Sequence, residues 1–177
     1  MYRKIFLKNF NSEDIMKKIL SLALALVMLV TFASCGEANP KNFSAQGMTV
    51  TLTDAFKENT QAGYTVCYES SDVAVFILKE SFSIQPGVEN LTLDEYAELV
   101  RQSNASRSPS AITKQDGFHS MEYTFLNEQE NQTYSYFCTM FKGTDAFWLV
   151  QFACKEGDYD SYRDTFLGWA KTVTFDS

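Results

Sequence analysis

The only histidine of the chain, His119, is the residue best suited to general-base chemistry. It lies in the stretch DGFHSMEYTF, three residues after Asp116 and next to Ser120. A hydrolase could use a histidine oriented by Asp116, with Ser120 or a serine elsewhere as the nucleophile. Nothing in this stretch resembles a nucleophile elbow, so a hydrogen-bonded or solvated histidine at the start of a strand is the favoured interpretation. We therefore expect no catalytic residue, no enzymatic activity and no cofactor.

Carboxylates gather in the stretch KEGDYDSYRD, at Glu156, Asp158, Asp160 and Asp164. Such a group could bind calcium, which prefers six to eight oxygen ligands. The stretch lacks the ligand order of an EF-hand, and acidic residues are also favoured at a helix N-terminus by the helix dipole. A single histidine makes a multi-histidine metal site impossible. We therefore expect no metal site.

Four cysteines occur, at positions 35, 67, 138 and 154, and no two of them form a CxxC pair. The last three lie in expected strands. A hairpin turn at Gly143 and Thr144 would place Cys138 opposite about Leu149, so Cys138 and Cys154 would not face each other. A disulfide from Cys67 to either remains open, and three buried free thiols are the alternative.

Aromatic residues make up 15% of the chain. Four of them could form a surface that stacks on a sugar or binds a peptide: Tyr134, Tyr136, Phe147 and Trp148. Strand aromatics are more often part of a core, because each buries a large apolar area. These four residues are the candidate ligand-binding residues.

The chain is acidic, with a net charge of −7. Residues 1–34 carry five basic and two acidic side chains, so their removal leaves 10 basic and 20 acidic side chains and a net charge of −10. A charge of this sign repels a phosphate backbone, and no basic stripe offsets it. We therefore expect no nucleic-acid partner.

The pattern of residues in the N-terminal region is typical of an export signal. From Met16, a candidate for the true start, two lysines precede fifteen uncharged residues, 19–33. Fifteen residues are short for a bilayer crossing, which needs about 20, but suit the apolar part of a signal peptide. The segment ends in Phe32, Ala33, Ser34 and Cys35 and resembles the bacterial lipoprotein box.

This resemblance implies that the Cys35 sulfur receives a diacylglycerol and that Cys35 becomes the first mature residue. We expect residues 1–34 to be leader and signal peptide, residues 35–44 the lipidated cysteine and a tether, and residues 45–177 one domain. The protein would then lie outside the cytoplasm in the cell envelope, held to the membrane by its lipid, where an envelope protein is a possible partner.

Alternating apolar residues predict the strands. GMTVTLT places Met48, Val50 and Leu52 on one face, and GYTVCYES does the same for Tyr64, Val66 and Tyr68. DVAVFILKES is continuously apolar from position 73 to 78, which indicates a strand covered on both faces. Further strands are expected in SAITKQDG, HSMEYTFLN, QTYSYFCTMF and AFWLVQFAC, the last two joined by a turn in which Gly143 could adopt a positive φ.

Two helices are expected. LTLDEYAELVRQSN opens with Thr92 and Glu95 at the spacing of a capping box. DYDSYRDTFLGWAKTVTF carries an apolar stripe and begins with Asp158 or Asp160 as its cap, and a short strand could follow it at residues 172–175. The order is three strands, a helix, four strands and a helix, which predicts an α+β fold with a largely antiparallel sheet covered by helices.

This layout resembles the PsbP/Mog1-like family of small α+β domains, some of which occur as bacterial lipoproteins. The resemblance rests on FSAQGMTVTLTDAF, LTLDEYAELV, KGTDAFWLVQFAC and YRDTFLGWAKTVTF. It implies a binding or assembly role more often than catalysis. We therefore expect a membrane-anchored binding or assembly module, with an extracytoplasmic small-ligand receptor, or a hydrolase that uses His119, as alternatives.

Overall fold

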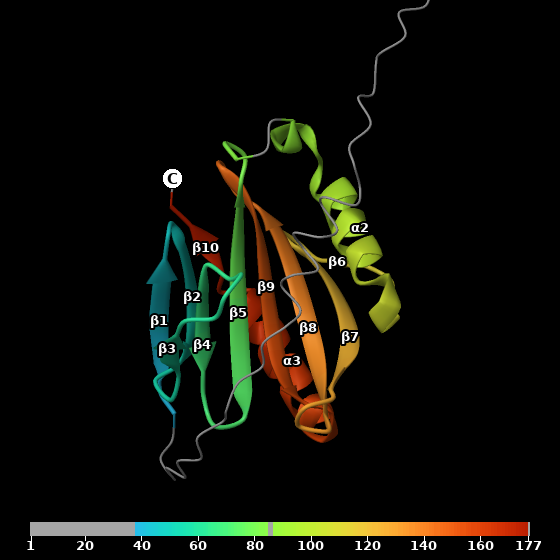
Figure 1. Ribbon diagram of the computed structural model, residues 1–177. Coiled ribbons are helices and arrows are strands. Elements are labelled where there is room, and N and C mark those ends of the chain that lie inside the picture. The colour runs from blue at the N-terminus through green and yellow to red at the C-terminus, as the bar shows by residue number, and fades with distance from the viewer. Residues whose placement is uncertain (1–37, 85–86, 177) are drawn as a thin grey trace, which may run out of the picture.

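The computed structural model describes residues 38–84 and 87–176 (Figure 1). The expected signal peptide, Met16 and Cys35 lie outside these residues. Within the described ranges, none of the helices has both the length and the apolar character needed to cross a membrane.

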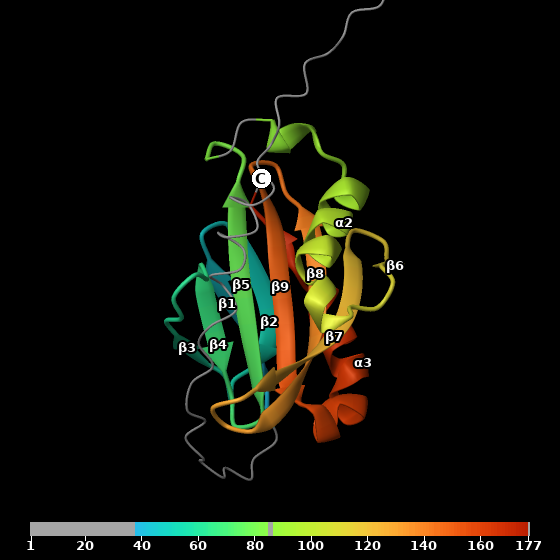
Figure 2. The ribbon, with the colours of Figure 1, turned by 45° about the vertical axis from the view of Figure 1, so that its right-hand side comes forward.

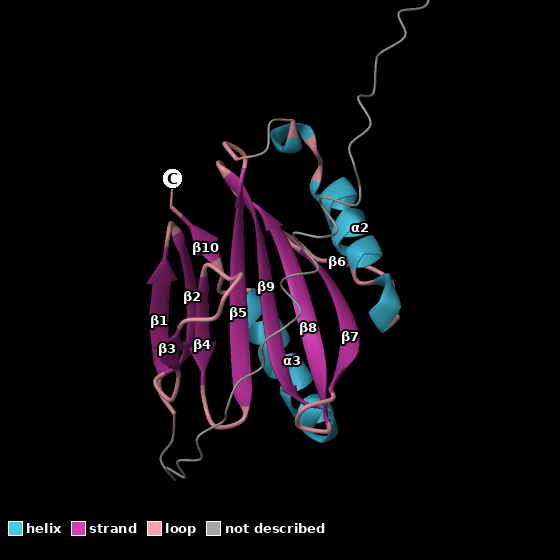
Figure 3. Cartoon of the chain, viewed as in Figure 1, coloured by secondary structure: helices cyan, strands magenta, loops and turns pink. Residues whose placement is uncertain are grey.

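The largest element of the described structure is one antiparallel sheet of seven strands (Figure 3). Across the sheet the strands are β3 (Lys57–Asn59), β4 (Val66–Glu69), β5 (Val73–Ser81), β9 (Ala146–Lys155), β8 (Gln132–Lys142), β7 (His119–Asn127) and β6 (Thr113–Lys114). The apolar strand β5 lies between β4 and β9 and is packed on both faces, which confirms the expectation from its continuous apolar run.

A second sheet of three strands lies beside the first: β1 (Pro40–Ala45), β2 (Met48–Thr53) and β10 (Thr174–Phe175). The tether expected up to residue 44 is therefore shorter, because β1 begins at Pro40. The reason is Phe43, whose ring is buried against Tyr68 with a centroid distance of 4.8 Å. The final strand was expected, but its pairing with β2 was not.

The two helices cover opposite faces of the large sheet (Figure 2). Helix α2 (Leu93–Ser103) contacts β7 and β8 on one face. Helix α3 (Tyr159–Ala170) contacts β8, β9 and the small sheet on the other. The described residues also include three short 3₁₀ turns: η2 (Val88–Asn90), η3 (Ala105–Arg107) and η4 (Glu156–Asp158).

The predicted capping residues are found at the start of both helices, but only α2 has the side-chain hydrogen bonds of a cap. At α2 the predicted capping box is complete, because Thr92 Oγ1 accepts from the Glu95 backbone N–H and the Glu95 carboxylate accepts from the Thr92 N–H. At α3, Asp158 occupies the N-cap position as expected, but its side chain makes no capping hydrogen bond.

Two expected details are wrong. The register of the β8–β9 hairpin places Cys138 opposite Gln151, not Leu149. Gly143 does not have a positive φ. Its role is close packing: a Cβ at this position would lie 3.2 Å from Nε1 of Trp148 and 3.4 Å from the Ala146 carbonyl oxygen.

Candidate functional site

His119 is held by a carboxylate that the sequence pattern did not identify. Its Nε2 lies 2.5 Å from Oδ1 of Asp94, at the start of α2, and Asp94 Oδ2 also pairs with Lys114. Two hydrogen bonds lower the pKa of the Asp94 carboxyl group: the bond from Lys114 has the larger effect, and the bond from His119 has the smaller one. Asp116, the expected partner, does not bond to the His119 ring, because Nε2 pairs with Asp94 and Nδ1 has no hydrogen-bond partner among the described residues.

The hydroxyl required for a hydrolase does not meet His119 in the described residues. Ser120 follows His119 directly in β7, so the two side chains point to opposite faces of the sheet. The His119 ring is 8% exposed, and its Nδ1 is buried without a hydrogen-bond partner among the described residues. This geometry connects α2 to the sheet edge through Asp94, His119 and Lys114.

The acidic stretch at residues 156–164 forms η4 and the first turns of α3. In the described part of the chain, no three His, Cys, Asp or Glu side chains come close enough together to hold a metal ion. Ser161 Oγ donates to the Asp158 carbonyl, so the backbone of this turn is satisfied by a neighbouring hydroxyl.

The three described cysteines are free and buried. Cys67 and Cys138 face α2 but are separated by three strand spacings, about 14 Å, which is too far for a disulfide. Cys154 lies on the opposite face. Burial raises the pKa of all three thiols, to about 12 for Cys67 and Cys154. The free-thiol alternative therefore describes this structure, and these thiols are poor nucleophiles.

The four expected ligand-binding aromatics do not form one surface. Trp148 faces α3 and is 1% exposed, with Phe175 at a centroid distance of 5.6 Å. Phe147, its neighbour in β9, faces the other side and is fully buried under Tyr96, stacked at 4.1 Å. Tyr134 and Tyr136 of β8 lie on the same face as Phe147, so three of the four candidates share a face and Trp148 does not.

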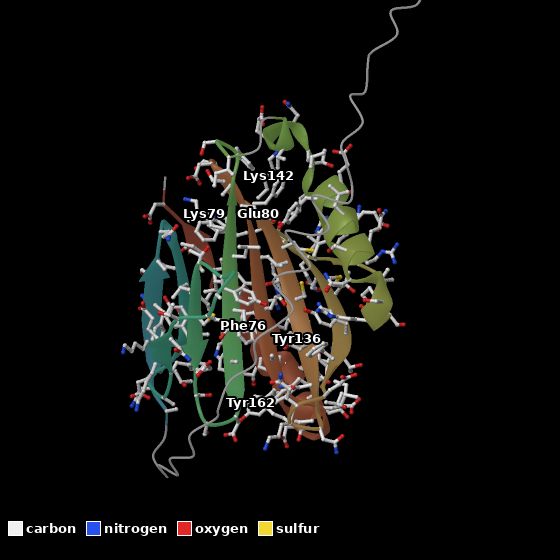
Figure 4. The ribbon with its side chains drawn as sticks, viewed as in Figure 1. Phe76, Lys79, Glu80, Tyr136, Lys142 and Tyr162 are labelled. Atoms are coloured by element: carbon white, nitrogen blue, oxygen red, sulfur yellow. The ribbon has the colours of Figure 1, made fainter. Side chains whose placement is uncertain are left out.

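Tyr136 belongs to a line of rings that crosses the α2 side of the sheet. We call this line the aromatic row, and it consists of Tyr64, Phe76, Tyr136 and Tyr123. Consecutive centroids lie 5.0, 6.4 and 4.9 Å apart, and the rings of Tyr136 and Tyr123 are nearly parallel, at 10°. Figure 4 shows Phe76 and Tyr136 in the middle of this face. Four different segments of the chain contribute the row.

Arg107 of η3 lies at the Tyr123 end of the aromatic row. Its guanidinium carbon is 5.4 Å from the Tyr123 ring centre and 5.2 Å from that of Phe125, within the range of a cation–π contact. Its Nη1 donates to Asn104 Oδ1 at 2.5 Å. The row therefore ends at a half-buried cation.

Polar groups are built into the same face. The Tyr123 hydroxyl donates to Oε1 of Gln151, which is 5% exposed, at 2.7 Å. Burial raises the pKa of Tyr136 to about 12, and the positive charge of Arg107 opposes this rise. The tyrosine hydroxyls of the row are therefore neutral, and Arg107 is the nearby cation that affects their pKa values.

At the end of the sheet near η2, Glu80 accepts a hydrogen bond from the Tyr96 hydroxyl at 2.5 Å. Burial raises the pKa of Glu80, and the bond from Tyr96 opposes the rise. Lys142 donates to the carbonyls of Leu91 and Glu89, at 2.6 and 3.0 Å, above the Phe147 ring. Figure 4 shows Lys79, Glu80 and Lys142 together at this end. These contacts attach the segment before α2 to the sheet.

Sequence reasoning missed most of the site. It placed Tyr64 with Val66 and Tyr68, but β4 begins only at Val66, and a turn directs the Tyr64 ring onto Phe76 on the other face. The alternation in HSMEYTFLN could have placed Tyr123 with Met121 on one face. Arg107, in the polar stretch ASRSPS, carries no comparable signal.

Comparisons with known proteins identify the fold. No family model and no curated protein matches the sequence. Among solved structures, the PsbP protein of the cyanobacterium Synechocystis sp. PCC 6803 (CyanoP) is similar with a TM-score of 0.54 and 10% identity, over 83% of this chain and 98% of that one.

Two further structures are similar at lower TM-scores. The Ran-binding protein Mog1p of Saccharomyces cerevisiae has a TM-score of 0.48 and 6% identity, over 78% of this chain and 96% of that one. LpqN of Mycobacterium tuberculosis, described as involved in cell envelope biogenesis, has a TM-score of 0.46 and 7% identity, over 80% and 93%.

The chain therefore has the PsbP/Mog1-like α+β fold that the sequence patterns predicted, a sheet-dominated structure with two helices. At these identities the likeness concerns the fold. The fold is compatible with a binding or assembly module and specifies no particular activity.

Proposed function

We propose that this protein is a lipid-anchored, extracytoplasmic binding or assembly module of the cell envelope. The observation that carries the proposal is the position of Cys35, at the end of a lipoprotein box and only five residues before Pro40, where β1 begins. A signal peptide would thus end almost where the folded domain starts.

The start of the folded domain limits the length of the proposed anchor. Asn39 is already fixed to the domain, because its carbonyl accepts from the Asp54 N–H at 2.8 Å and its own N–H donates to Asp54 Oδ1 at 3.0 Å. Cys35 is therefore at most about 17 Å from Pro40 along an extended chain. A lipid on Cys35 would hold the β1 end of the domain close to the bilayer.

Binding fits the chemistry of the domain better than catalysis does. The aromatic row and Arg107 supply large apolar surface and one cation, whereas His119 pairs with Asp94 and meets no hydroxyl among the described residues. A small-ligand receptor is the second candidate, favoured by this same face. The net charge of −10 after signal removal disfavours a nucleic-acid partner.

Replacing Cys35 in the bacterial host tests the anchor. We expect Cys35→Ser to abolish the mass increase from diacylglycerol and to move the protein from the membrane fraction to the soluble fraction. Ser34→Ala is the matched control, because it keeps a small residue before the cysteine and should leave both readouts unchanged. Unchanged mass and membrane retention of Cys35→Ser would refute the proposal.

A further inference from the structure

We propose that the outer edge of β1 pairs in antiparallel orientation with β1 of a second copy of this chain, so that the two small sheets join into one. This inference rests on the proposed assembly function and names its partner. Figure 1 shows β1 at one outer edge of the molecule, and β2 is its neighbour on the other side.

Strand β1 is the longest edge strand in the described parts of the chain. It has six residues, whereas the edge strand β3 has three and the edge strands β6 and β10 have two each. Phe43 is the buried residue of β1, and the other five are exposed or half-exposed. An exposed edge of this kind presents backbone donors and acceptors that serve as a template for pairing with another strand.

The β1–β2 hairpin determines which backbone groups of β1 are directed outward. Its two-residue turn, Gln46 and Gly47, has a positive φ at both positions, as in a type I′ turn, so the residues that flank the turn form a hydrogen-bonded pair. Hydrogen-bonded pairs alternate along an antiparallel ladder. The backbone groups of Asn42 and Ser44 are therefore directed away from β2.

An observed hydrogen bond agrees with this alternation. Thr51, opposite Asn42 in the register, donates its N–H to Thr172 Oγ1 at 2.9 Å, on the side of β2 away from β1. The side chains of Asn42 and Ser44 bond to Thr51 and Thr49 of β2, at 2.8 and 2.7 Å. Their backbone N–H and C=O groups form no hydrogen bond within residues 38–84 and 87–176, so they are available to a second strand.

A two-fold axis at Phe43 makes this edge complementary to itself. The axis places Asn42 of one copy opposite Ser44 of the other, twice, and each pair exchanges both of its backbone hydrogen bonds. An axis at Asn42 would instead place Ser44 opposite Pro40, which has no N–H to donate. The register centred on Phe43 therefore uses the outward N–H groups of both Asn42 and Ser44.

The charge of β1 allows a second copy of this acidic domain to approach. Residues 40–45 include no carboxylate, and their one charged side chain, Lys41, lies over the Phe43 ring at 4.8 Å. In the proposed register Lys41 faces Ala45 of the other copy, so like charges are not opposite each other. The net charge of −10 after signal removal makes most other surfaces of the domain repel a second copy.

The proposed lipid anchor favours a weak pairing of this kind. One pair of short strands makes a small interface, which by itself gives a low affinity. Cys35 lies five residues before Pro40, so anchored copies are confined to one membrane surface with β1 close to it, and this confinement raises their effective concentration. The pairing is therefore expected between tethered copies rather than in dilute solution.

Cysteine cross-linking in host membranes tests the pairing. Ser44→Cys would place its thiol diagonally across the axis from that of the second copy, about 7–8 Å away, which a short bis-maleimide spans. We expect a cross-linked species of twice the mass. Its yield should be at least about fivefold higher than that from Thr49→Cys, whose thiols on β2 would be three strand spacings apart, about 14 Å.

Thr49→Cys is the matched control because Ser44 and Thr49 face each other and share one hydrogen bond, so either substitution loses the same contact. Cys67, Cys138 and Cys154 should contribute little background, since all three thiols are buried and burial raises their pKa values.

A proline at the edge tests the backbone bonds. Asn42→Cys should cross-link as Ser44→Cys does, because it is also diagonal to its counterpart across the axis. Adding Ser44→Pro to Asn42→Cys should lower this yield at least about fivefold, since proline removes an outward N–H but no bond of the hairpin. Thermal unfolding by circular dichroism would verify that each variant is folded.

Three results would overturn the inference: equal yields from Ser44→Cys and Thr49→Cys, cross-linking of Ser44→Cys only to a protein of another mass, or an undiminished yield when Ser44→Pro is added. Cys35→Ser reports on the anchor through the mass of the lipid and membrane retention. Failure of the pairing and failure of the proposed anchor therefore give distinguishable results.

Discussion

The two faces of the large sheet are built from the same strands but differ in chemistry. The face under α3 and the small sheet has Trp148, Phe152 and Phe166 at its centre, and its buried polar residues on the large sheet are hydroxyl side chains: Ser120, Ser135 and Thr139. The face under α2 also buries rings, but most are tyrosines, and it includes the polar residues Gln151 and His119. The comparison teaches that the two faces of one sheet can bury different side chains, mainly phenylalanine and tryptophan rings on one and tyrosine rings with an amide and an imidazole on the other.

The free-energy cost of burying polar side chains bears on the difference between the two faces. A core that served stability alone would gain little from a glutamine or a carboxylate, because each must find hydrogen bonds to offset its loss of water. On the α2 face Gln151 and Glu80 have such bonds, from Tyr123 and Tyr96. Substitutions on the two faces should therefore affect different measurements.

The largest loss of stability is expected from the α3 face. Phe166 is fully buried and stacks on Phe152 and Tyr162, so Phe166→Ala should lower the free energy of unfolding by about 3–5 kcal/mol. Tyr136→Phe on the other face should change it by less than about 0.5 kcal/mol, because the hydroxyl has no described partner. Urea unfolding measures both, and similar losses for the two variants would contradict the division between the faces.

An intermediate loss is expected at the β8–β9 turn, which fixes the register that separates the two faces. Gly143→Ala would push a methyl group to 3.2 Å from the Trp148 indole nitrogen and should cost about 1–3 kcal/mol. Gly157→Ala is the matched control, since a Cβ there meets nothing within 4 Å. Thermal unfolding monitored by circular dichroism compares them; a stable Gly143→Ala protein would show that the turn is adaptable.

A smaller loss is expected at the start of α2, the helix that covers the tyrosine face. Thr92→Ala removes the capping box and should destabilise the protein by about 1 kcal/mol, whereas Thr92→Ser retains the hydroxyl and should be close to the wild type. Amide hydrogen exchange in α2 is the sharper measurement. Increased exchange in α3 rather than in α2 would contradict an independent contribution of this cap.

The smallest effect is a change in pH dependence at Glu80. Its pKa is raised in the folded state by burial, so wild-type stability should fall as pH rises from about 4.5 through that raised pKa. Glu80→Gln cannot ionise, so its stability relative to the wild type should increase between pH 4 and pH 8. Denaturant unfolding at both pH values measures this difference.

Glu98→Gln gives a control of opposite sign. A hydrogen bond from Arg101 lowers the pKa of Glu98 to about 2, so the wild type gains stability as pH rises from about 2 to 4.5 and keeps it at pH 8. This variant should therefore be less stable than the wild type at pH 8. Two variants with the same pH trend would show that neither carboxylate acts locally.

Local patterns predicted the fold but not the site. Alternation in MTVTLT and the capping box at Thr92 depend on neighbours within four residues, and both were confirmed. The strand β1 was missed because PKNFSA is mostly polar and is held by the single ring of Phe43. The same patterns separate Phe147 from Trp148, since adjacent strand residues face opposite sides of a sheet.

The sequence by itself determined the α+β class and the order of most elements, because each depends on residue types at short spacing. Only the tertiary structure decided which side chains meet. Strand order brings Tyr64, Phe76, Tyr136 and Tyr123 into one row, α2 supplies Asp94 to His119, and η3 places an unpaired Arg107 over the end of the row. These contacts join residues up to 60 positions apart, as with Phe76 and Tyr136, for which no local periodicity provides a signal.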